Sequence, residues 1–242
     1  MLLNRFTRLK GLGRYACLGT AVLAALGRKY KMHNMQKGRV DYLLQVMDNP
    51  SLSCKPDLAI PHLARDYIAP TITQQAHLCP DFRPELVFVD SFSELTDQMF
   101  RHKSQGWSFC CNYQDLRHDD GFAETFESLG LLDLGTLQAR YTRILQAISE
   151  RWGDIPIIYL HFPDALEYRE KFVERAREIR GIVDTLAAAW PNLHSFSVPS
   201  AIVKHPAVVE PGMENFPYHY SQETYVAFAE MIRAKSALKR FF

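Results

Sequence analysis

Two side chains in this sequence could together carry nucleophilic acyl chemistry: a hydroxyl that attacks and an imidazole that takes its proton. Ser91 directly follows a short apolar run rich in β-forming residues, Glu85–Val89. If a helix opens just after Ser91, its first backbone N–H groups would lie near the hydroxyl and could stabilise an oxyanion. The same spacing, Ser91-x-x-Glu94, also fits a capping box, in which the serine only completes a helix end. The sequence leaves both interpretations of Ser91 open.

His219 is the candidate base. Ser221 fits the N-cap of a C-terminal helix, with Glu223 in its first turn. The positive end of that helix disfavours an imidazolium ion, so it favours a neutral ring that can accept a proton. The simpler interpretation is a histidine that packs between Tyr218 and Tyr220.

Alternating strand-like and helix-like segments predict the scaffold that would position these side chains. Three apolar runs are typical of buried parallel strands: Glu85–Val89, Ile155–Leu160 and Leu193–Val198. Apolar residues spaced by three and four predict three helices: Leu137–Trp152, Phe172–Trp190 and Tyr225–Ile232. Prolines between positions 50 and 84 favour short helices and loops there. The alternation predicts an α/β fold, a three-layer α/β/α sandwich around a mostly parallel sheet.

Residues just past the predicted strands are expected to converge on one edge of the sheet. Ligands of open parallel sheets bind beyond the carboxyl ends of the strands. Asp90, His161 and Tyr218 are among the polar residues that would share this edge with Ser91 and His219.

Other clusters of charged residues or cysteines are weaker candidates for a functional site. Arg169, near the start of a predicted helix, could reach an anionic substrate, whereas a Glu167/Lys171 pair on that helix is typical of a solvated face. The adjacent residues His118-Asp119-Asp120 fit a solvated turn better than a metal site. Cys110-Cys111 fits a buried strand.

Two segments resemble blocks of the SGNH/GDSL hydrolase superfamily. The run FPYHYSQETYVAFAEMI resembles its last block, which carries a histidine, and VFVDSFSEL resembles its first block as found in polysaccharide O-acetyl esterases and acetyltransferases. Both motifs are short, and the strand–helix alternation over residues 85–235 is compatible with them. The resemblance implies a flavodoxin-like sandwich and serine-dependent acyl transfer on a carbohydrate or cell-surface glycan, with no metal or nucleotide cofactor. Ser91 would be the nucleophile and His219 the base.

The third catalytic residue departs from the family pattern. The family places an acid three residues before the histidine, and that position here is Phe216. Asp90 adjoins the candidate nucleophile, and Asp164 or Glu214 could orient His219, but no spacing rule selects among these carboxylates.

Two other blocks, the Gly-x-Asn-Asp block and the nucleophile block, also depart from the family pattern. The family's Gly-x-Asn-Asp block is not recognisable, which leaves Asn112 or His161 to supply a polar group at the oxyanion. If the first strand were Arg14–Gly19, then Gly19-Thr20-Ala21 would occupy the nucleophile block and the chain would be a non-catalytic binding or scaffolding module.

The N-terminal region has an unusual charge. Residues 1–40 hold nine Lys or Arg and no Asp or Glu, while the other residues carry a net charge of −8. Such a block could contact a membrane surface or an anionic polymer, and no nucleic-acid signature accompanies it. Its apolar run, Tyr15–Leu26, fits a signal peptide, an interfacial helix, or a first strand turning through Gly19 into a buried helix.

Domain boundaries and compartment follow from these features. Residues 1–84 form a basic segment that could also supply the first strand and helix of the domain, and residues 85–242 form the α/β core. Five cysteines without a CxxC pair suit a reducing, cytoplasmic setting, with peripheral membrane contact as an option.

Overall fold

The computed structural model describes residues 8–77, 82–209 and 216–242. The chain forms two compact units. The first contains Met1–His33, Phe82–Ser91 and Asp154–Phe242, and the second contains Asn34–Asp81 and Phe92–Gly153.

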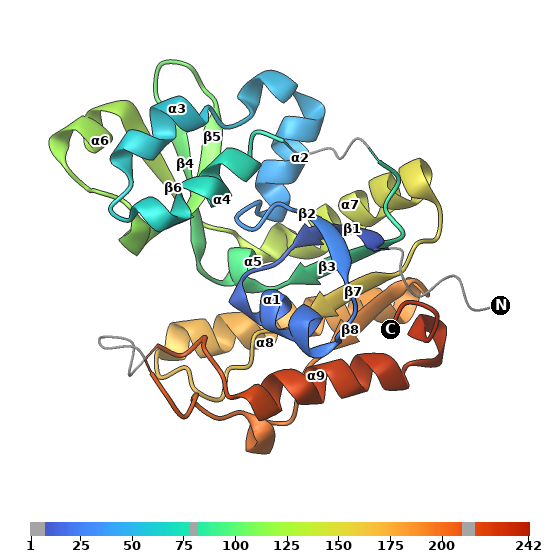
Figure 1. Cartoon of the computed structure of the whole chain (residues 1–242). Coiled ribbons are helices and arrows are strands. Elements are labelled where there is room, and N and C mark those ends of the chain that lie inside the picture. The colour runs from blue at the N-terminus through green and yellow to red at the C-terminus, as the bar shows by residue number, and fades with distance from the viewer. Residues whose placement is uncertain (1–7, 78–81, 210–215) are drawn as a thin grey trace. The chain divides into compact units, whose positions relative to one another are not determined.

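The first unit is built on a five-stranded sheet with the strand order β2-β1-β3-β7-β8 (Figure 1). Its strands are β1 (Leu9–Arg14), β2 (Tyr30–Asn34), β3 (Leu86–Asp90), β7 (Ile157–Leu160) and β8 (Leu193–Phe196). The pairs β1–β3, β3–β7 and β7–β8 are parallel. Every residue of the central strand β3 is buried, which explains its continuous apolar sequence. The three predicted strands are therefore confirmed.

Three helices cover this sheet: α1 (Cys17–Ala25), α8 (Glu170–Ala189) and α9 (Gln222–Ala234). α1 connects β1 to β2 toward one edge of the sheet, and α8 connects β7 to β8 toward the other. Right-handed crossovers in opposite directions place their helices on opposite faces. α9 packs against α1 (Figure 1). The arrangement is consistent with the predicted α/β/α sandwich. Short 3₁₀ segments occur at Ser200–Ile202 and Ser236–Leu238.

The apolar run near the N-terminus forms a buried helix that follows a strand. Leu18 and Val22 of α1 are fully buried, so the buried helix predicted for this run is confirmed, whereas the predicted turn from a strand at Gly19 is wrong. β1 ends at Arg14, and Gly19 lies inside α1. The alternative with Gly19-Thr20-Ala21 at a strand end is therefore wrong. Within the described part of the chain, no helix has both the length and the hydropathy needed to cross a bilayer.

The second unit contains a three-stranded antiparallel sheet that the sequence did not predict. Its strands, in the order β5-β4-β6, are β4 (Asp97–His102), β5 (Ser108–Asn112) and β6 (Phe126–Leu131). Its helices are α2 (Val40–Asp48), α3 (Pro56–Ala59), α4 (Ala69–Gln74), α5 (Phe92–Thr96), α6 (Asp120–Thr125) and α7 (Leu137–Trp152). Short 3₁₀ segments occur at Pro50–Leu52, Ile60–His62, Asp66–Ile68, Tyr113–Asp115 and Leu134–Thr136. α7 confirms the helix predicted over Leu137–Trp152, and it packs against α2 in this unit.

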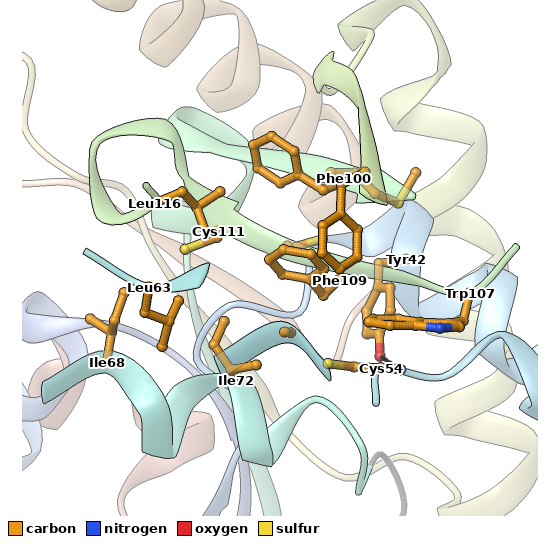
Figure 2. Close-up of a cluster of buried hydrophobic side chains, with 14 of the residues drawn as sticks. Tyr42, Cys54, Leu63, Ile68, Ile72, Phe100, Trp107, Phe109, Cys111 and Leu116 are labelled. Carbon is orange, nitrogen blue, oxygen red and sulfur yellow. Dashed lines mark hydrogen bonds between the residues drawn. The ribbon is translucent and has the colours of Figure 1, made fainter. Parts of the chain in front are cut away.

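Aromatic and aliphatic side chains pack together with cysteines in the core of the second unit (Figure 2). The rings of Phe100 and Phe109 stack with their centroids 5.5 Å apart. Cys110 and Cys111 are fully buried in β5, as predicted.

A buried ion cluster ties the start of the second unit to its sheet. Lys37 is 3% exposed, and its Nζ lies 3.3 Å from carboxylate oxygens of both Asp97 and Asp115. Burial lowers the pKa of Lys37, but the neighbouring carboxylates outweigh burial and raise it. Lys37 is therefore charged, and its two partners compensate that charge.

Candidate functional site

Ser91 lies at the carboxyl end of β3, as the sequence predicts, but its side chain is bound to the end of β7. The residue is 4% exposed. Its backbone N–H donates to the carbonyl of Leu160 (3.0 Å), and its Oγ accepts from the backbone N–H of Phe162 (2.9 Å). α5 does begin directly after Ser91, and the carboxylate of Glu94 in that helix accepts from the backbone N–H of Val40. These bonds join Ser91 to the end of β7 and Glu94 to the start of α2.

Asp90 caps the start of α1. Its side chain is almost fully buried, and its Oδ2 accepts from the backbone N–H groups of Ala16 (2.7 Å) and Gly19 (3.3 Å). Ala16 is the N-cap residue of α1 and has no side-chain acceptor of its own, so Asp90 supplies the missing one. This carboxylate therefore occupies two of the N–H groups at a helix end that attracts anions.

Cys17 is a potential nucleophile that sequence analysis missed. It is the first residue of α1, it is partly exposed, and its Sγ lies 3.4 Å from the carbonyl oxygen of Tyr218. Burial, and then the charge of Asp90, raise the pKa of Cys17 to about 12. The resting side chain is therefore a thiol that donates to this carbonyl.

His219 follows Tyr218 and so lies close to the start of α1. Its ring is half-buried, with its centroid 4.8 Å from that of Phe216. Ser221 is the N-cap residue of α9, as predicted. The hydrogen bonds of Ser91 to other described residues are those to Leu160 and Phe162. Direct pairing of Ser91 with His219 stays a prediction.

Tyr218 belongs to a buried polar cluster. Its hydroxyl donates to Oε2 of Glu167 (2.6 Å) and accepts from Nη2 of Arg169 (3.2 Å). Arg169 also binds both carboxylate oxygens of Glu167, each at 2.7 Å. Burial raises the pKa of Glu167, but the hydrogen bonds from Arg169 and Tyr218 outweigh burial and lower it. Glu167 precedes α8 and is buried, so its assignment to a solvated helix face with Lys171 is wrong.

Aromatic rings surround Arg169. Its guanidinium carbon lies 4.3 Å from the ring centroid of Phe172, 5.6 Å from that of Tyr168 and 5.9 Å from that of Tyr218. Tyr168 is 73% exposed. Glu167 already compensates the charge of Arg169, and the predicted contact of Arg169 with an anionic substrate stays untested.

His161 lies at the end of β7 and is bound on its Nε2 side. Its Nε2 is 2.8 Å from Oγ of Ser195, which donates to Oδ1 of Asp184 (2.5 Å). Burial lowers the pKa of His161 despite the neighbouring carboxylate, so the ring is neutral near pH 7.

Of the other predicted site residues, Asp164 and Asn112 have partners of their own. Asp164 binds Arg177 with an N–O distance of 2.9 Å. Glu214 lies outside the described residues. Asn112 lies in the second unit, where its Oδ1 accepts from the backbone N–H of Gln114. Their proposed roles at the site stay predictions.

Asp119, from the adjacent residues His118-Asp119-Asp120, is a helix cap. Its Oδ1 accepts from the backbone N–H of Phe122 at the start of α6. His118 stacks on Tyr113, with ring centroids 3.7 Å apart. Across the described residues, no group of three or more His, Cys, Asp or Glu side chains is arranged to hold a metal ion.

Comparison with known proteins does not assign the chain to a family. No protein-family model matches the sequence, and no curated protein matches it. One solved structure, a carbohydrate esterase with divergent catalytic and non-catalytic binding functions at its active site, is similar to this chain with 10% identity and a TM-score of 0.43. The match covers 98% of this chain and 68% of that one. These values are too low for the likeness to define the activity of this chain.

Proposed function

We propose that the carboxyl edge of the five-stranded sheet is an acyl-transfer site, which acts on a carbohydrate ester as a hydrolase or acyltransferase. The observation that carries this proposal is the contact between Cys17 Sγ and the carbonyl oxygen of Tyr218. This contact brings the segment of His219 to the start of α1. The capping bond from Asp90 brings the end of β3, and with it Ser91, to the same helix end.

The proposed reaction uses Ser91 as nucleophile and His219 as base. The hydroxyl oxygen attacks the acyl carbonyl while the imidazole takes its proton, and the imidazolium then protonates the departing sugar oxygen. Water, or the hydroxyl of an acceptor sugar, next attacks the acyl-serine and restores both side chains. The N–H of Phe162 already donates to Oγ of Ser91, which stabilises negative charge on that oxygen.

Cys17 is the second nucleophile that this edge offers. It is more exposed than Ser91 and adjoins the carbonyl next to His219. Because the raised pKa of Cys17 keeps it protonated, attack by its sulfur also requires a base. The intermediate would then be a thioester in place of an ester.

Rapid-quench mass spectrometry with an acetylated sugar, followed by peptide mapping, tests the proposal and identifies the nucleophile. We expect a covalent acetyl group on Ser91, and hydrolysis slowed roughly 10²-fold or more in Ser91→Ala and His219→Gln. The exposed Ser236→Ala is the matched control. An acetyl group on Cys17, lost in Cys17→Ala, would move the nucleophile to the thiol. No acyl-enzyme and no hydrolysis of any acetylated sugar would overturn acyl transfer.

Stability must be measured beside activity. Removing the hydroxyl of Ser91 leaves the buried N–H of Phe162 without its acceptor, which costs roughly 1–3 kcal/mol. A Ser91→Ala protein that is less stable but fully active would show that this serine is structural.

A non-catalytic binding module is the second candidate, and the position of Asp90 favours it. Its carboxylate occupies N–H groups at the start of α1, and its charge helps to keep Cys17 protonated. Saturable binding of an acylated oligosaccharide without turnover would support this candidate.

This second candidate includes contact of residues 1–40 with a membrane or an anionic polymer. β1 and α1 lie within that region, so deleting it would remove part of the sheet. The exposed side chains of Lys10 and Lys31 allow a gentler test. We expect the double variant Lys10→Gln/Lys31→Gln to weaken salt-sensitive vesicle binding, and unchanged binding would contradict this contact.

A further inference from the structure

A cavity of about 390 Å³ lies at the amino ends of β7 and β8, the opposite end of these strands from the proposed acyl-transfer site. Its volume falls within the range of roughly 300–1,000 Å³ that is typical of small-molecule sites. Strand-end residues and the C-terminal segment line it: Asp154, Pro156, Pro191, Asn192, His194, Ala237, Arg240 and Phe241.

The central observation is the environment of His194. The residue is only 8% exposed, it lines the cavity, and its ring has no hydrogen bond to another described residue. Burial, followed by the positive charge of Lys235, lowers the pKa of His194. The ring is therefore neutral near pH 7 and presents one donor and one acceptor. The ring has no hydrogen-bond partner among the described residues, so a ligand in the cavity could use its donor and its acceptor.

Three further polar groups converge on the same cavity. Asp154 makes no hydrogen bond or ion pair with another described residue. The guanidinium of Arg240 lies over the ring of Phe241 at 4.6 Å from its centroid and has no carboxylate partner within the described chain. Asn192 uses its Nδ2 to bind the carbonyl of Ile155, which leaves its Oδ1 as an acceptor.

We propose that this cavity binds an anionic, polyhydroxylated molecule the size of a monosaccharide, either a sugar acid or a sugar phosphate. Arg240 supplies the cation for the acidic group. The carboxylate of Asp154, the Oδ1 of Asn192 and the ring of His194 accept hydroxyl hydrogens. This inference does not depend on acyl transfer at the other end of the sheet.

Calorimetric titration of the full-length protein tests the proposal with glucuronate, glucose 6-phosphate, glucose and inorganic phosphate. We expect saturable binding of at least one of the two anionic sugars, with a Kd near or below about 1 mM. Arg240→Gln should weaken it about tenfold or more, because a charge-assisted hydrogen bond is lost. Lys239→Gln removes the same charge one residue away, outside the cavity lining, and is the matched control.

The variants test the acidic group and the sugar hydroxyls of the ligand independently. Asp154→Asn should weaken binding of the anionic sugar and leave any binding of inorganic phosphate unchanged or stronger, since a negative charge is removed. Binding of phosphate and glucose 6-phosphate with equal affinity would overturn the sugar part of the proposal. The absence of binding up to about 10 mM, or binding indifferent to Arg240→Gln, would overturn the site itself.

Discussion

The carboxylate of Asp90 accepts a 2.7 Å hydrogen bond from the backbone N–H of Ala16, and this bond joins the end of β3 to the start of α1. One side chain thereby caps a helix that cannot cap itself. The same negative charge contributes to the raised pKa of Cys17. Asp90 thus links the architecture of this edge to the reactivity of its thiol.

Replacing Asp90 should therefore activate Cys17. In Asp90→Asn the amide oxygen can still accept from α1, but the charge that helps to raise the pKa of Cys17 is gone. We expect the pH profile of iodoacetamide alkylation at Cys17, followed by peptide mapping, to shift to lower pH. Glu85→Gln, at the other end of β3, is the control and should leave the profile unchanged. An unshifted profile in Asp90→Asn would contradict this coupling.

Two helical glycines should respond in opposite directions to alanine. A Cβ on Gly19 would lie 2.6 Å from Cγ of Tyr15, whereas a Cβ on Gly181 in α8 meets nothing within 4 Å. Gly181→Ala should gain up to about 1 kcal/mol from helix propensity. Gly19→Ala should lose roughly 1–3 kcal/mol because the overlap outweighs that gain. Urea unfolding of the two variants checks this, and stabilisation by Gly19→Ala would show that Tyr15 moves aside.

Removing the charge of Lys37 should strongly destabilise the second unit. Lys37→Met leaves Asp97 and Asp115 without their shared buried cation, and such a loss costs roughly 3–5 kcal/mol. Asp115 keeps its ion pair with Arg65 at 3.5 Å, so Asp97 is the carboxylate that loses its cation. The double variant Lys37→Met/Asp97→Leu should therefore recover part of that loss. Urea unfolding provides both values. Lys55→Met, at an exposed lysine, is the control and should change the free energy of unfolding by about 0.5 kcal/mol at most.

Acid should weaken the first unit through Glu167. Its pKa is lowered in the folded protein, so its contribution to stability is complete above the pKa of the unfolded chain, about 4.3, and is lost as the pH falls through the folded value. We expect Glu167→Gln to be less stable at pH 7 and to lose less stability between about pH 5 and pH 3. The measurement is the free energy of unfolding across that window. Glu170→Gln, at an exposed neighbour, should retain the wild-type slope, and an identical slope in Glu167→Gln would refute the assignment.

Local patterns were sufficient to predict much of the first unit. The apolar runs of β3, β7 and β8 and the periodicity of α8 and α9 each lie within one short segment. β1 and β2 were not identified as strands, because Lys10 and two glycines interrupt β1 and polar residues dominate β2. The antiparallel sheet of the second unit depends on pairings between segments with mixed polarity, such as β4 and β6.

The candidate site was predicted less completely because its contacts join distant parts of the chain. Cys17 sits inside an apolar run, and only its contact with Tyr218, 201 positions away, sets it apart. The role of Asp90 as a cap likewise depends on Ala16, which gives no capping signal of its own. Glu167 fits a helix-surface pattern in the sequence, but in the structure it is buried and bonded to Arg169 and Tyr218.

The strand order has a consequence for how the chain is made. β1 lies beside β3, which is about 75 positions further along, and β3 must then wait for β7, which begins at residue 157. During synthesis the centre of this sheet therefore stays incomplete until β7 has left the ribosome. Until then the apolar strand β3 is unpaired on one side and can associate with other chains. We therefore expect the yield of native protein to depend on the amount of chaperone present.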